Sequence, residues 1–428
     1  MWSINLQMKK YCRWTDLACK LDKRLIECLS DTLKCPHVAK VQKATVPLLM
    51  QRKNLVVQAC TGSGKTLSYL VPIFQRMVES EDEEGVQGLI ILPSRELAIQ
   101  VNQVANQISK YLNNIKDNIK ANSLILIGGY PIEKDLKKFE EEGARLLIGT
   151  PGRLYEFIEK SRVLLNDVET LIMDEGDKLL ELADSIKLLK ILDLLPSTKT
   201  IGVFSATITQ NLEKLLSVNL SNALQVTVPV FKGDLSDSST ILATANEYEA
   251  PVQISPLTKQ SFSELSKKRC EVPQSITNSY GVVSNYMQKL DIIHWFIREH
   301  SDSKCIVFLS TCACVEYYYY LFTELFPELK KMNVFDRLHR KMAQKKRDKV
   351  YSSFLSASSG MLLCTDILAR GIDIPDVQWI IQYDPPQHSD SFLHRVGRTA
   401  RAGKEGMVSL WSNRVDIDIA HREGRTIH

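Results

Sequence analysis

Short apolar runs, separated by longer amphipathic stretches, recur along the chain, and each run ends in glycine, proline or a polar residue. Runs of this kind are typical of strands in a parallel sheet that is covered on both faces, because helices connect successive parallel strands. The pattern occurs twice, so we predict an α/β fold of two tandem domains, each a parallel sheet covered by helices. The predicted strands read NLVVQA, GLIILP, SLILIGG, ARLLIGT, ETLIMDE and TIGVFSA in the first half, and KCIVFLS, GMLLCTD, VQWIIQYD and GMVSLWS in the second.

The stretch between the two halves has a different composition, rich in serine, threonine and proline. Such a composition predicts a flexible linker, which we place at residues 231–271. The sequence then divides into an N-terminal domain at 1–230 and a C-terminal domain at 272–428. A chain of 428 residues is long for a single hydrophobic core, which agrees with this division.

The charge balance is close to neutral and therefore decides little. The chain has 54 basic and 50 acidic residues, for a net charge of +4, which permits a polyanionic partner without requiring one. No apolar run approaches the roughly 18–20 residues of a membrane span, so we predict no membrane segment, and the N-terminus lacks the apolar core of a signal peptide. The ten cysteines form no CxxC pair, which favours reduced thiols in a cytosolic or nuclear protein over zinc or disulfides.

A glycine-rich loop follows the first predicted strand and precedes a predicted helix. It reads ACTGSGKT, from Ala59 to Thr66. Gly62 and Gly64 allow backbone N–H groups to turn toward a phosphate, and the helix adds its positive N-terminus. Lys65 would reach the β- and γ-phosphates of a nucleotide, and the Thr66 hydroxyl would bind Mg²⁺. The predicted phosphate site is therefore made by Ala59, Thr61, Gly62, Ser63, Gly64, Lys65 and Thr66.

Three acids crowd the end of another predicted strand, in the sequence MDEGDKLLE. Asp174, Glu175 and Asp177 need a counter-charge, a metal ion or water, because like charges at this spacing repel. A phosphate site of the kind described above needs one carboxylate to hold the Mg²⁺ hydration shell and a second acid to orient the attacking water. We assign Asp174 to the first role and Glu175 to the second, with Lys65 and the metal as counter-charges. A solvated acidic helix cap would account for Asp174 alone.

These motifs and their order resemble those of the DEAD-box RNA helicases, superfamily 2 ATPases built from two RecA-like domains. The resemblance extends from about residue 14 to residue 411. It implies ATP and Mg²⁺ as cofactors, RNA as a partner, and an RNA-stimulated ATPase that acts as a helicase. Trp14 and Gln42 resemble the adenine-reading Q motif, in which the glutamine amide pairs with the base and the aromatic ring stacks nearby. The motif departs from the family where Val38-Ala39 replaces Pro-Thr and Cys35 replaces an aromatic residue.

Several further motifs resemble the RNA-contacting segments of the family. PSRELA, a Gly-Gly pair and TPGRL lie in the first half, and a threonine after KCIVFLS, a QxxR pattern on a basic helix and the stretch LLCTDILARGIDIP lie in the second. Glycines and helix N-termini offer N–H groups to phosphates and arginines offer charge, so these motifs suit the sugar–phosphate backbone rather than base edges. The implied RNA-binding residues are Arg95, Gly129, Thr150, Gly152, Arg153, Thr311, Arg347, Thr365 and Gly371.

Other residues of the resemblance concern coupling between ATP and RNA. Ser205 and Thr207 match the motif that couples hydrolysis to strand separation, and we expect them to form hydrogen bonds with Asp177. His394 is also assigned to coupling, through the motif HRVGRTAR. Asp373 is expected to meet the nucleotide ribose.

The same HRVGRTAR motif would supply two arginine fingers. Arg398 and Arg401, predicted to lie one helical turn apart, would act across the cleft on the γ-phosphate. An arginine pair at this spacing is usually only solvated. The surrounding motifs favour the catalytic interpretation.

Two positions depart from the family pattern. The tetrapeptide reads DEGD rather than DEAD, with Gly176 in place of alanine. Both acids remain, so we expect activity with a looser local backbone. In LHRKM, Arg340 stands where the family has glycine, beside the predicted RNA-binding helix.

The segments STCACVEYY, QACTGSGKTL and GIDIPDVQWIIQYDPP resemble the subfamily that acts on ribosomal RNA during large-subunit assembly. This resemblance implies ribosomal RNA and pre-ribosomal particles as partners, a monomer, and a nuclear, mainly nucleolar location with a cytoplasmic pool. That subfamily carries a further C-terminal extension, which this chain, ending at His428, would lack or hold in compact form.

Two other functions would use the same motifs. One is an ATP-gated RNA clamp that serves as an assembly platform with little unwinding, and the other is a DNA-directed motor. The family reads the A-form backbone and the 2′-hydroxyl, which favours RNA over DNA. A structural protein with an inactive ATP site is disfavoured, because the phosphate loop, the acid pair and both arginines are all present.

Overall fold

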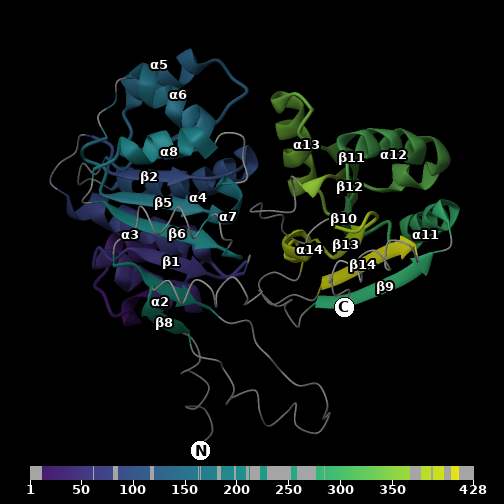
Figure 1. The fold of residues 1–428 in the computed structure, drawn as a ribbon, viewed down its shortest axis with the longest axis horizontal. Coiled ribbons are helices and arrows are strands. Elements are labelled where there is room, and N and C mark those ends of the chain that lie inside the picture. The colour runs from purple at the N-terminus through teal and green to yellow at the C-terminus, as the bar shows by residue number, and fades with distance from the viewer. Residues whose placement is uncertain are drawn as a thin grey trace, which may run out of the picture. The chain divides into compact units, whose positions relative to one another are not determined.

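The chain divides into two compact units. In the computed structural model, the described residues up to 257 belong to the first unit and those from 276 onward belong to the second. Figure 1 labels the helices and strands. The described residues are 12–60, 62–80, 85–115, 120–161, 163, 165–180, 185–196, 199–208, 212, 222–228, 252–257, 276–283, 285–366, 377–386, 389–399 and 406–413.

The first unit is built on a sheet in which β1, the strand before the phosphate loop, lies beside β6, and β6 lies beside β5. The strand order is β3-β4-β2-β5-β6-β1-β7-β8, and the described pairings are parallel except for that of β7 with β8. Helices therefore connect the parallel strands, as the apolar runs predicted. The strands are β1 Leu55–Gln58, β2 Gly88–Ile91, β3 Ser123–Leu126, β4 Leu146–Gly149, β5 Thr170–Asp174, β6 Thr200–Ser205, β7 Leu224–Thr227 and β8 Gln253–Pro256.

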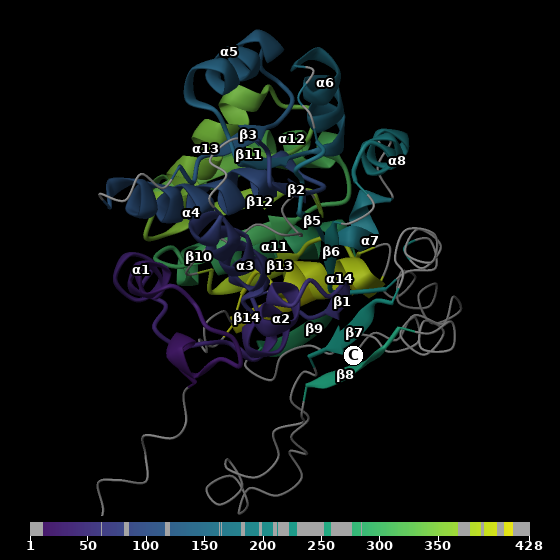
Figure 2. The same ribbon diagram turned by 90° about the vertical axis from the view of Figure 1, so that its left-hand side faces the viewer.

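Helices cover both faces of this sheet. Residues of α1 to α4 pack on one face together with Val57 and Ile90, and residues of α5 to α8 pack on the other together with Val56 and Leu89. Figure 2 shows α1, α3 and α4 on one side of the strands and α7 and α8 on the other. Alternate strand residues thus enter separate cores. The helices are α1 Lys23–Glu27, α2 Lys40–Met50, α3 Lys65–Glu79, α4 Arg95–Asn114, α5 Ile132–Glu142, α6 Pro151–Ser161, α7 Gly176–Leu179 and α8 Ser185–Asp193, with short turns η1 Trp14–Asp16 and η2 Cys28–Thr32.

The second unit has a parallel sheet of order β11-β12-β10-β13-β14-β9. One core contains residues of α13 and α14, and the other contains residues of α11 and α12. This arrangement and that of the first unit confirm the predicted fold class. The elements are β9 Ile276–Val283, α11 Tyr286–Glu299, β10 Lys304–Phe308, α12 Cys312–Leu325, η3 Pro327–Lys331, β11 Val334–Leu338, α13 Gln344–Ser356, β12 Gly360–Cys364, β13 Trp379–Gln382, α14 Ser389–Val396 and β14 Gly406–Asn413.

All ten strands predicted from the apolar runs are present, and the described residues contain four further strands that were missed. The missed strands are β7, β8, β9 and β11, which are short or carry polar residues. β9 pairs with β14 in parallel over eight residues, from Ile276 with Gly406 to Val283 with Asn413. β8 lies within the segment predicted to be a linker, so at least these four residues join the first sheet.

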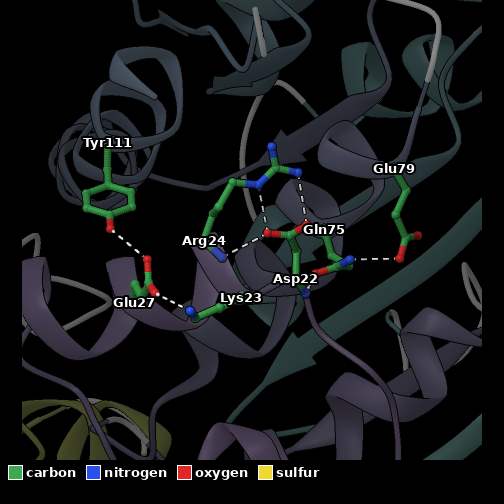
Figure 3. Close-up of polar contacts among 7 residues, drawn as sticks. All are labelled: Asp22, Lys23, Arg24, Glu27, Gln75, Glu79 and Tyr111. Carbon is green, nitrogen blue, oxygen red and sulfur yellow. Dashed lines mark hydrogen bonds and ion pairs between the residues drawn. The ribbon is translucent and has the colours of Figure 1, made fainter. Parts of the chain in front are cut away.

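The segment that carries the predicted Q motif is fastened to α3 and α4 by side-chain hydrogen bonds (Figure 3). The Asp22 backbone N–H, at the start of α1, donates to Gln75 Oε1 on α3 at 2.7 Å, and Gln75 Nε2 donates to Glu79 Oε1 at 2.7 Å. The Tyr111 hydroxyl on α4 donates to Glu27 Oε2 on α1 at 3.5 Å. These contacts fix the N-terminal segment against the helix that begins at the phosphate loop.

The described part of the chain contains no helix that is both long and apolar enough to cross a membrane. Its cysteines are unpaired, and Cys28, Cys305 and Cys364 are buried. Burial raises the pKa of Cys28 to about 11, although a hydrogen bond with Thr32 opposes the rise. This thiol therefore stays protonated at neutral pH and behaves as a small core side chain.

Candidate functional site

The phosphate loop follows the carboxyl end of β1, and its conformation depends on glycine. Gly62 has a φ of 78° and Gly64 a φ of 97°, in the left-handed region that side chains disfavour. A Cβ on Gly64 would lie 2.7 Å from Gln42 Nε2, so the Gln42 amide would have to move to admit a side chain there. Gly64 is also the N-cap of α3, whose first residue is Lys65. The loop therefore adjoins the N-terminus of a 15-residue helix, which favours an anion.

Hydrogen bonds within the loop hold its charged side chain in place. Lys65 is buried, and its ammonium donates to the Ala59 carbonyl at 3.0 Å. Ser63 Oγ donates to the Cys60 carbonyl at 2.8 Å. The lysine charge thus lies within the loop where the phosphates are predicted to bind. Thr61 lies outside the described residues.

Asp174 is the last residue of β5, and two hydrogen bonds fix its carboxylate. Oδ1 accepts from the Glu175 backbone N–H at 2.9 Å, and Oδ2 accepts from the Tyr69 hydroxyl at 3.0 Å. The Thr66 hydroxyl acts on the same phenol, where it opposes the rise that burial causes in the pKa of Tyr69. Burial raises the pKa of Asp174 to about 6, although the Lys65 ammonium lowers it and the Glu175 carboxylate raises it further. Both residues predicted to bind Mg²⁺ therefore lie beside the Tyr69 side chain.

Glu175 follows in an unusual backbone conformation. Its φ of 49° and ψ of 51° are left-handed, which costs a non-glycine residue on the order of 1 kcal/mol. The residue is 3 % exposed, and its Oε2 atom has no hydrogen-bond partner among the residues described. An unsatisfied buried carboxylate oxygen is costly. A bound water, which the predicted mechanism requires, would satisfy it.

The donor set fits a magnesium ion held mainly by water and phosphate. Within the described ranges no group of three or more His, Cys, Asp and Glu side chains could hold a metal. Mg²⁺ does not need such a cage, because it keeps several waters and binds one or two carboxylates together with substrate phosphates. Thr66 and Asp174, which both lie beside the Tyr69 hydroxyl, provide this smaller set.

Asp177, in the short helix α7, accepts two hydrogen bonds from residues at and just after the end of β6. Ser205 Oγ donates to Oδ1 at 2.8 Å, and Thr207 Oγ1 donates to Oδ2 at 2.9 Å. Lys178 adds an ion pair with Oδ2 at 3.8 Å. The expected hydrogen bonds are thus present, whereas the coupling role of these residues stays a prediction.

Gly176 is tightly packed. A Cβ at this position would lie 2.9 Å from Val203 Cγ1 and 3.3 Å from Leu212 Cδ1. Val203 is a β-branched, buried residue of β6, so its side chain has little freedom to move away. The looser backbone expected from glycine is therefore not supported, because neighbouring side chains fill the space of the missing methyl group.

Trp14 and Gln42 of the predicted Q motif both form hydrogen bonds with other residues of the first unit. Trp14 is 1 % exposed, and its indole N–H donates to the Cys35 carbonyl at 2.7 Å, so the ring belongs to the core. Gln42 Oε1 accepts from the Ala39 N–H at 2.8 Å, and its Nε2 donates to the Gly64 carbonyl at 3.0 Å. The glutamine thus connects the predicted adenine site directly to the phosphate loop.

The predicted RNA motifs of the first unit follow the carboxyl ends of β2, β3 and β4. Arg95 begins α4, and its Nη2 lies 3.2 Å from where a Cβ on Gly128 would be. Gly129 has a φ of 103°. Thr150 lies just before α6, and its carbonyl accepts the first hydrogen bond of that helix, whose first turn contains Gly152. These residues therefore follow neighbouring strands at one edge of the sheet, and their contact with RNA stays a prediction.

Arg153, by contrast, makes its contacts with other residues of the first unit. Its Nε donates to the Ile127 carbonyl at 3.2 Å, and its guanidinium also contacts the Tyr130 carbonyl. It forms ion pairs with Asp135 and Glu156, each at 3.1 Å. Two carboxylates thus already neutralise this buried charge. Arg153 holds the glycine turn in place, and its predicted contact with RNA stays untested.

In the second unit, two predicted RNA-binding residues lie just after the carboxyl ends of β10 and β12. Thr311 is the N-cap of α12, and its hydroxyl accepts from the Cys314 N–H at 3.1 Å. Thr365 follows β12 directly. Arg347 is buried on α13, where its Nη1 donates to Gln344 Oε1 at 3.3 Å. Three predicted residues lie outside the described ranges: Gly371, Asp373 and Arg401.

Of the two predicted arginine fingers, Arg398 is the one that the described residues include, and it does not lie on a helix. α14 ends at Val396, so Arg398 lies in the turn that follows it. Arg398 is 1 % exposed. His394 lies on α14, and its side chain is outside the description.

Two site residues were missed from the sequence. Tyr69 is one, and its place three residues after Thr66 on a helix could have indicated that the two side chains meet. Arg395 is the other: its Nε donates to Asp366 Oδ1 at 2.6 Å, and its Nη1 donates to the Asp384 carbonyl at 2.8 Å. It therefore ties α14 to the segments that follow β12 and β13, and only its place inside HRVGRTAR could have indicated this.

Comparison with known proteins agrees with this geometry. The family model described as DEAD/DEAH box helicase matches residues 39–215, and the model described as helicase conserved C-terminal domain matches residues 288–403. The chain is 38 % identical over 404 residues to DEAD-box ATP-dependent RNA helicase 49 of Arabidopsis thaliana. This chain belongs to the DEAD-box helicase family.

This DEAD-box chain is also 34 % identical over 407 residues to ATP-dependent RNA helicase DDX55 of Homo sapiens. Each alignment covers 93 % of the chain, but only 64 % of the Arabidopsis protein and 60 % of the human one. The chain thus spans less than two thirds of the length of these relatives.

Among solved structures, the fold is similar to S. cerevisiae Dbp5 bound to RNA and ADP BeF3, with a TM-score of 0.72 and 21 % identity over 95 % of this chain and 93 % of that one. It is also similar to Mss116p bound to ssRNA and AMP-PNP, with a TM-score of 0.79 and 24 % identity over 98 % of this chain and 78 % of that one. At these identities the likeness concerns the fold alone, the tandem RecA-like architecture.

We predict that restoring the family alanine destabilises this DEAD-box protein. In Gly176→Ala the new methyl group overpacks against Val203, which lowers the free energy of unfolding by about 1–3 kcal/mol. The higher helix propensity of alanine offsets about 1 kcal/mol of this loss. Adding Val203→Ala should relieve the clash, so the double variant should be more stable than the sum of the single effects by about 1 kcal/mol. Denaturant unfolding of the full chain and the three variants measures this. Additive effects would show that the two residues do not compete for space.

Proposed function

We propose that this chain is an RNA-stimulated ATPase that closes on RNA and locally separates or remodels RNA duplexes. The observation that carries the proposal is the meeting of the phosphate-loop helix with a buried acid pair. Tyr69 of that helix donates to Asp174, and Glu175 keeps one unsatisfied oxygen. Family membership supports it, as do relatives named ATP-dependent RNA helicases.

Each group would act differently on the γ-phosphate. Lys65 supplies a fixed positive charge, and Glu175 accepts a hydrogen bond from the attacking water and orients it. Thr66 and Asp174 would hold Mg²⁺, which when bound neutralises charge that develops on the phosphates. Arg398 and Arg401, from the second unit, would add positive charge once ATP and RNA have brought the units together.

RNA would be held by its sugar–phosphate backbone. The predicted RNA contacts are divided between the units, with Arg95 and Thr150 in the first and Thr311 and Thr365 in the second. A ligand that contacts both units favours the closed state, and ATP does the same. Each ligand should therefore strengthen the binding of the other.

The proposed cellular substrate is ribosomal RNA in assembling large subunits, with the protein acting as a monomer in the nucleus, mainly the nucleolus. The support is the resemblance of three segments, STCACVEYY, QACTGSGKTL and GIDIPDVQWIIQYDPP, to the subfamily with that role. Crosslinking the protein to RNA in cells and sequencing the bound fragments tests the substrate. Enrichment of messenger RNA in place of ribosomal RNA would contradict the proposal.

A strand-displacement assay tests the activity itself. With ATP, the full chain should separate a short RNA duplex faster than the matched DNA duplex, because the proposed contacts read A-form geometry and 2′-hydroxyls. ATP-dependent retention of RNA without strand displacement would identify the protein as a clamp. Equal activity on DNA would identify a DNA-directed motor.

We predict that Glu175→Gln binds ATP and RNA but loses turnover. The amide keeps the size of the side chain but orients water poorly and accepts no proton, so RNA-stimulated hydrolysis should fall by about 10²–10⁴. Fluorescent-nucleotide binding and phosphate release measure the two effects separately. Glu79→Gln, which alters a carboxylate elsewhere in the same unit (Figure 3), is the matched control and should retain activity. Parental turnover in Glu175→Gln would remove Glu175 from the mechanism.

We predict that RNA affinity falls steeply with salt and depends little on sequence. For single-stranded RNA the logarithm of the affinity should fall with the logarithm of salt by about 0.7 per phosphate contacted. Arg95→Ala should reduce this slope by about that amount. Binding titrations on unrelated RNA sequences over a range of salt concentrations measure both effects. A flat salt dependence, or a strong preference for one short motif, would argue against backbone recognition.

We predict that Arg398→Ala retains nucleotide binding by the first unit and loses RNA-stimulated hydrolysis. Arginine fingers contribute about 10³–10⁵ in rate to phosphoryl transfer, and Arg401→Ala should show the same pattern. Arg298→Ala, at an exposed arginine of α11, is the control. Full RNA stimulation in both finger variants would contradict a mechanism that needs both units.

A further inference from the structure

Tyr69 is a buried residue that none of the motifs assigns to the site. It lies on α3, three residues after Thr66 and four after Lys65, so the three side chains share one side of the helix. The residue is fully buried, and its ring packs edge-on against Phe204 of β6, with centroids 5.2 Å apart and an interplanar angle of 67°. The ring is thus fixed between the phosphate-loop helix and the sheet.

The Tyr69 hydroxyl is bonded to one of the residues that would hold the metal and lies beside the other. It donates to Asp174 Oδ2 at 3.0 Å, and the Thr66 hydroxyl acts on the same phenol. The other oxygen of Asp174 accepts from the Glu175 backbone N–H at 2.9 Å. One donor therefore acts on each carboxylate oxygen, and each oxygen keeps a lone pair for a hydrated cation.

We propose that the Tyr69 hydroxyl positions the Mg²⁺ site of the ATPase, because it sets the orientation of the Asp174 carboxylate. The inference rests on the proposed function. Phenylalanine would fill the same volume but leave Asp174 Oδ2 without its donor. Groups that orient metal-binding side chains in this way typically change metal affinity or activity by 10–100-fold.

A purely structural role would have a different consequence. A phenol in the core needs a hydrogen-bond partner, and Asp174 would then only satisfy it. In that case removal of the hydroxyl would change thermal stability but not the response of the site to Mg²⁺. The two roles are therefore separated by the Mg²⁺ dependence of nucleotide binding.

The test compares the full-length parent with Tyr69→Phe, by titration of a fluorescent ATP analogue over a range of Mg²⁺ concentrations and in EDTA. We expect binding in EDTA to agree within about twofold, because Lys65 and the loop are unchanged. The Mg²⁺ concentration at half-effect should rise by roughly 10-fold or more in the variant. Saturating Mg²⁺ should restore most of the RNA-stimulated ATPase rate.

Tyr111→Phe is the matched control. Its hydroxyl also donates to a carboxylate of the first unit, that of Glu27 (Figure 3), so the same atom and the same type of hydrogen bond are removed between α4 and α1. Its Mg²⁺ midpoint should equal that of the parent. A thermal melt of each variant checks the fold. If Tyr69→Phe does not fold, Phe204→Leu keeps the hydroxyl but loosens the ring, and should raise the Mg²⁺ midpoint several-fold.

Two results would overturn the inference. An unchanged Mg²⁺ midpoint in Tyr69→Phe, or in Phe204→Leu if that variant is needed, would show that the hydroxyl does not position the metal. An equal loss of nucleotide binding with Mg²⁺ and with EDTA would show general damage to the pocket. In both cases Mg²⁺-dependent binding by the parent would leave the proposed function intact. A parent that binds no nucleotide would contradict the proposed function itself.

Discussion

The register between β1, β6 and β5 determines where the chemical groups of the first unit lie. Gln58 pairs with Ser205 and Asp174 pairs with Phe204, so the three strands end close to the same level. The phosphate loop, the acidic segment and the hydroxyls that follow β6 therefore emerge at one edge of the sheet. If one strand slipped by one residue against its neighbours, its side chains would point to the opposite faces of the sheet and into the wrong core. Because both faces are buried, the hydrophobic pattern that specifies the fold also specifies the site.

Each of the three acids at and just after the end of β5 lies in a different environment. Asp174 has a phenol and a backbone N–H, Asp177 has two hydroxyls and Lys178, and Glu175 keeps an unsatisfied oxygen. Asp177 therefore links α7 to the end of β6. The free oxygen of Glu175 is the group left for water. Equal charges in sequence thus become three different chemical roles through their partners.

The sequence predicted those parts of the molecule whose physical cause is local. Apolar runs gave ten strands, and the glycines with Lys65 gave the phosphate loop, because turn geometry and helix N-termini depend on neighbouring residues. Features that depend on distant partners were not predictable in this way. The ion pair of Arg153 with Asp135 was not predicted, because Asp135 lies outside the TPGRL motif and on a different helix. β11 was missed because its pattern carries charged residues, one of which, Arg337, is paired with Glu316 on α12.

The pairing of β9 with β14 has a consequence for synthesis of the chain. β9 is the first strand of the second unit, and its partner β14 is the last. More than a hundred residues separate them, so at about 5–20 residues per second the ribosome needs on the order of 10 s to deliver β14 after β9. During that interval β9 has an unpaired backbone edge, which is the kind of surface that aggregates or recruits chaperones. The second unit therefore completes its sheet only after β14 has been synthesised, whereas the first can fold while the second is still being made.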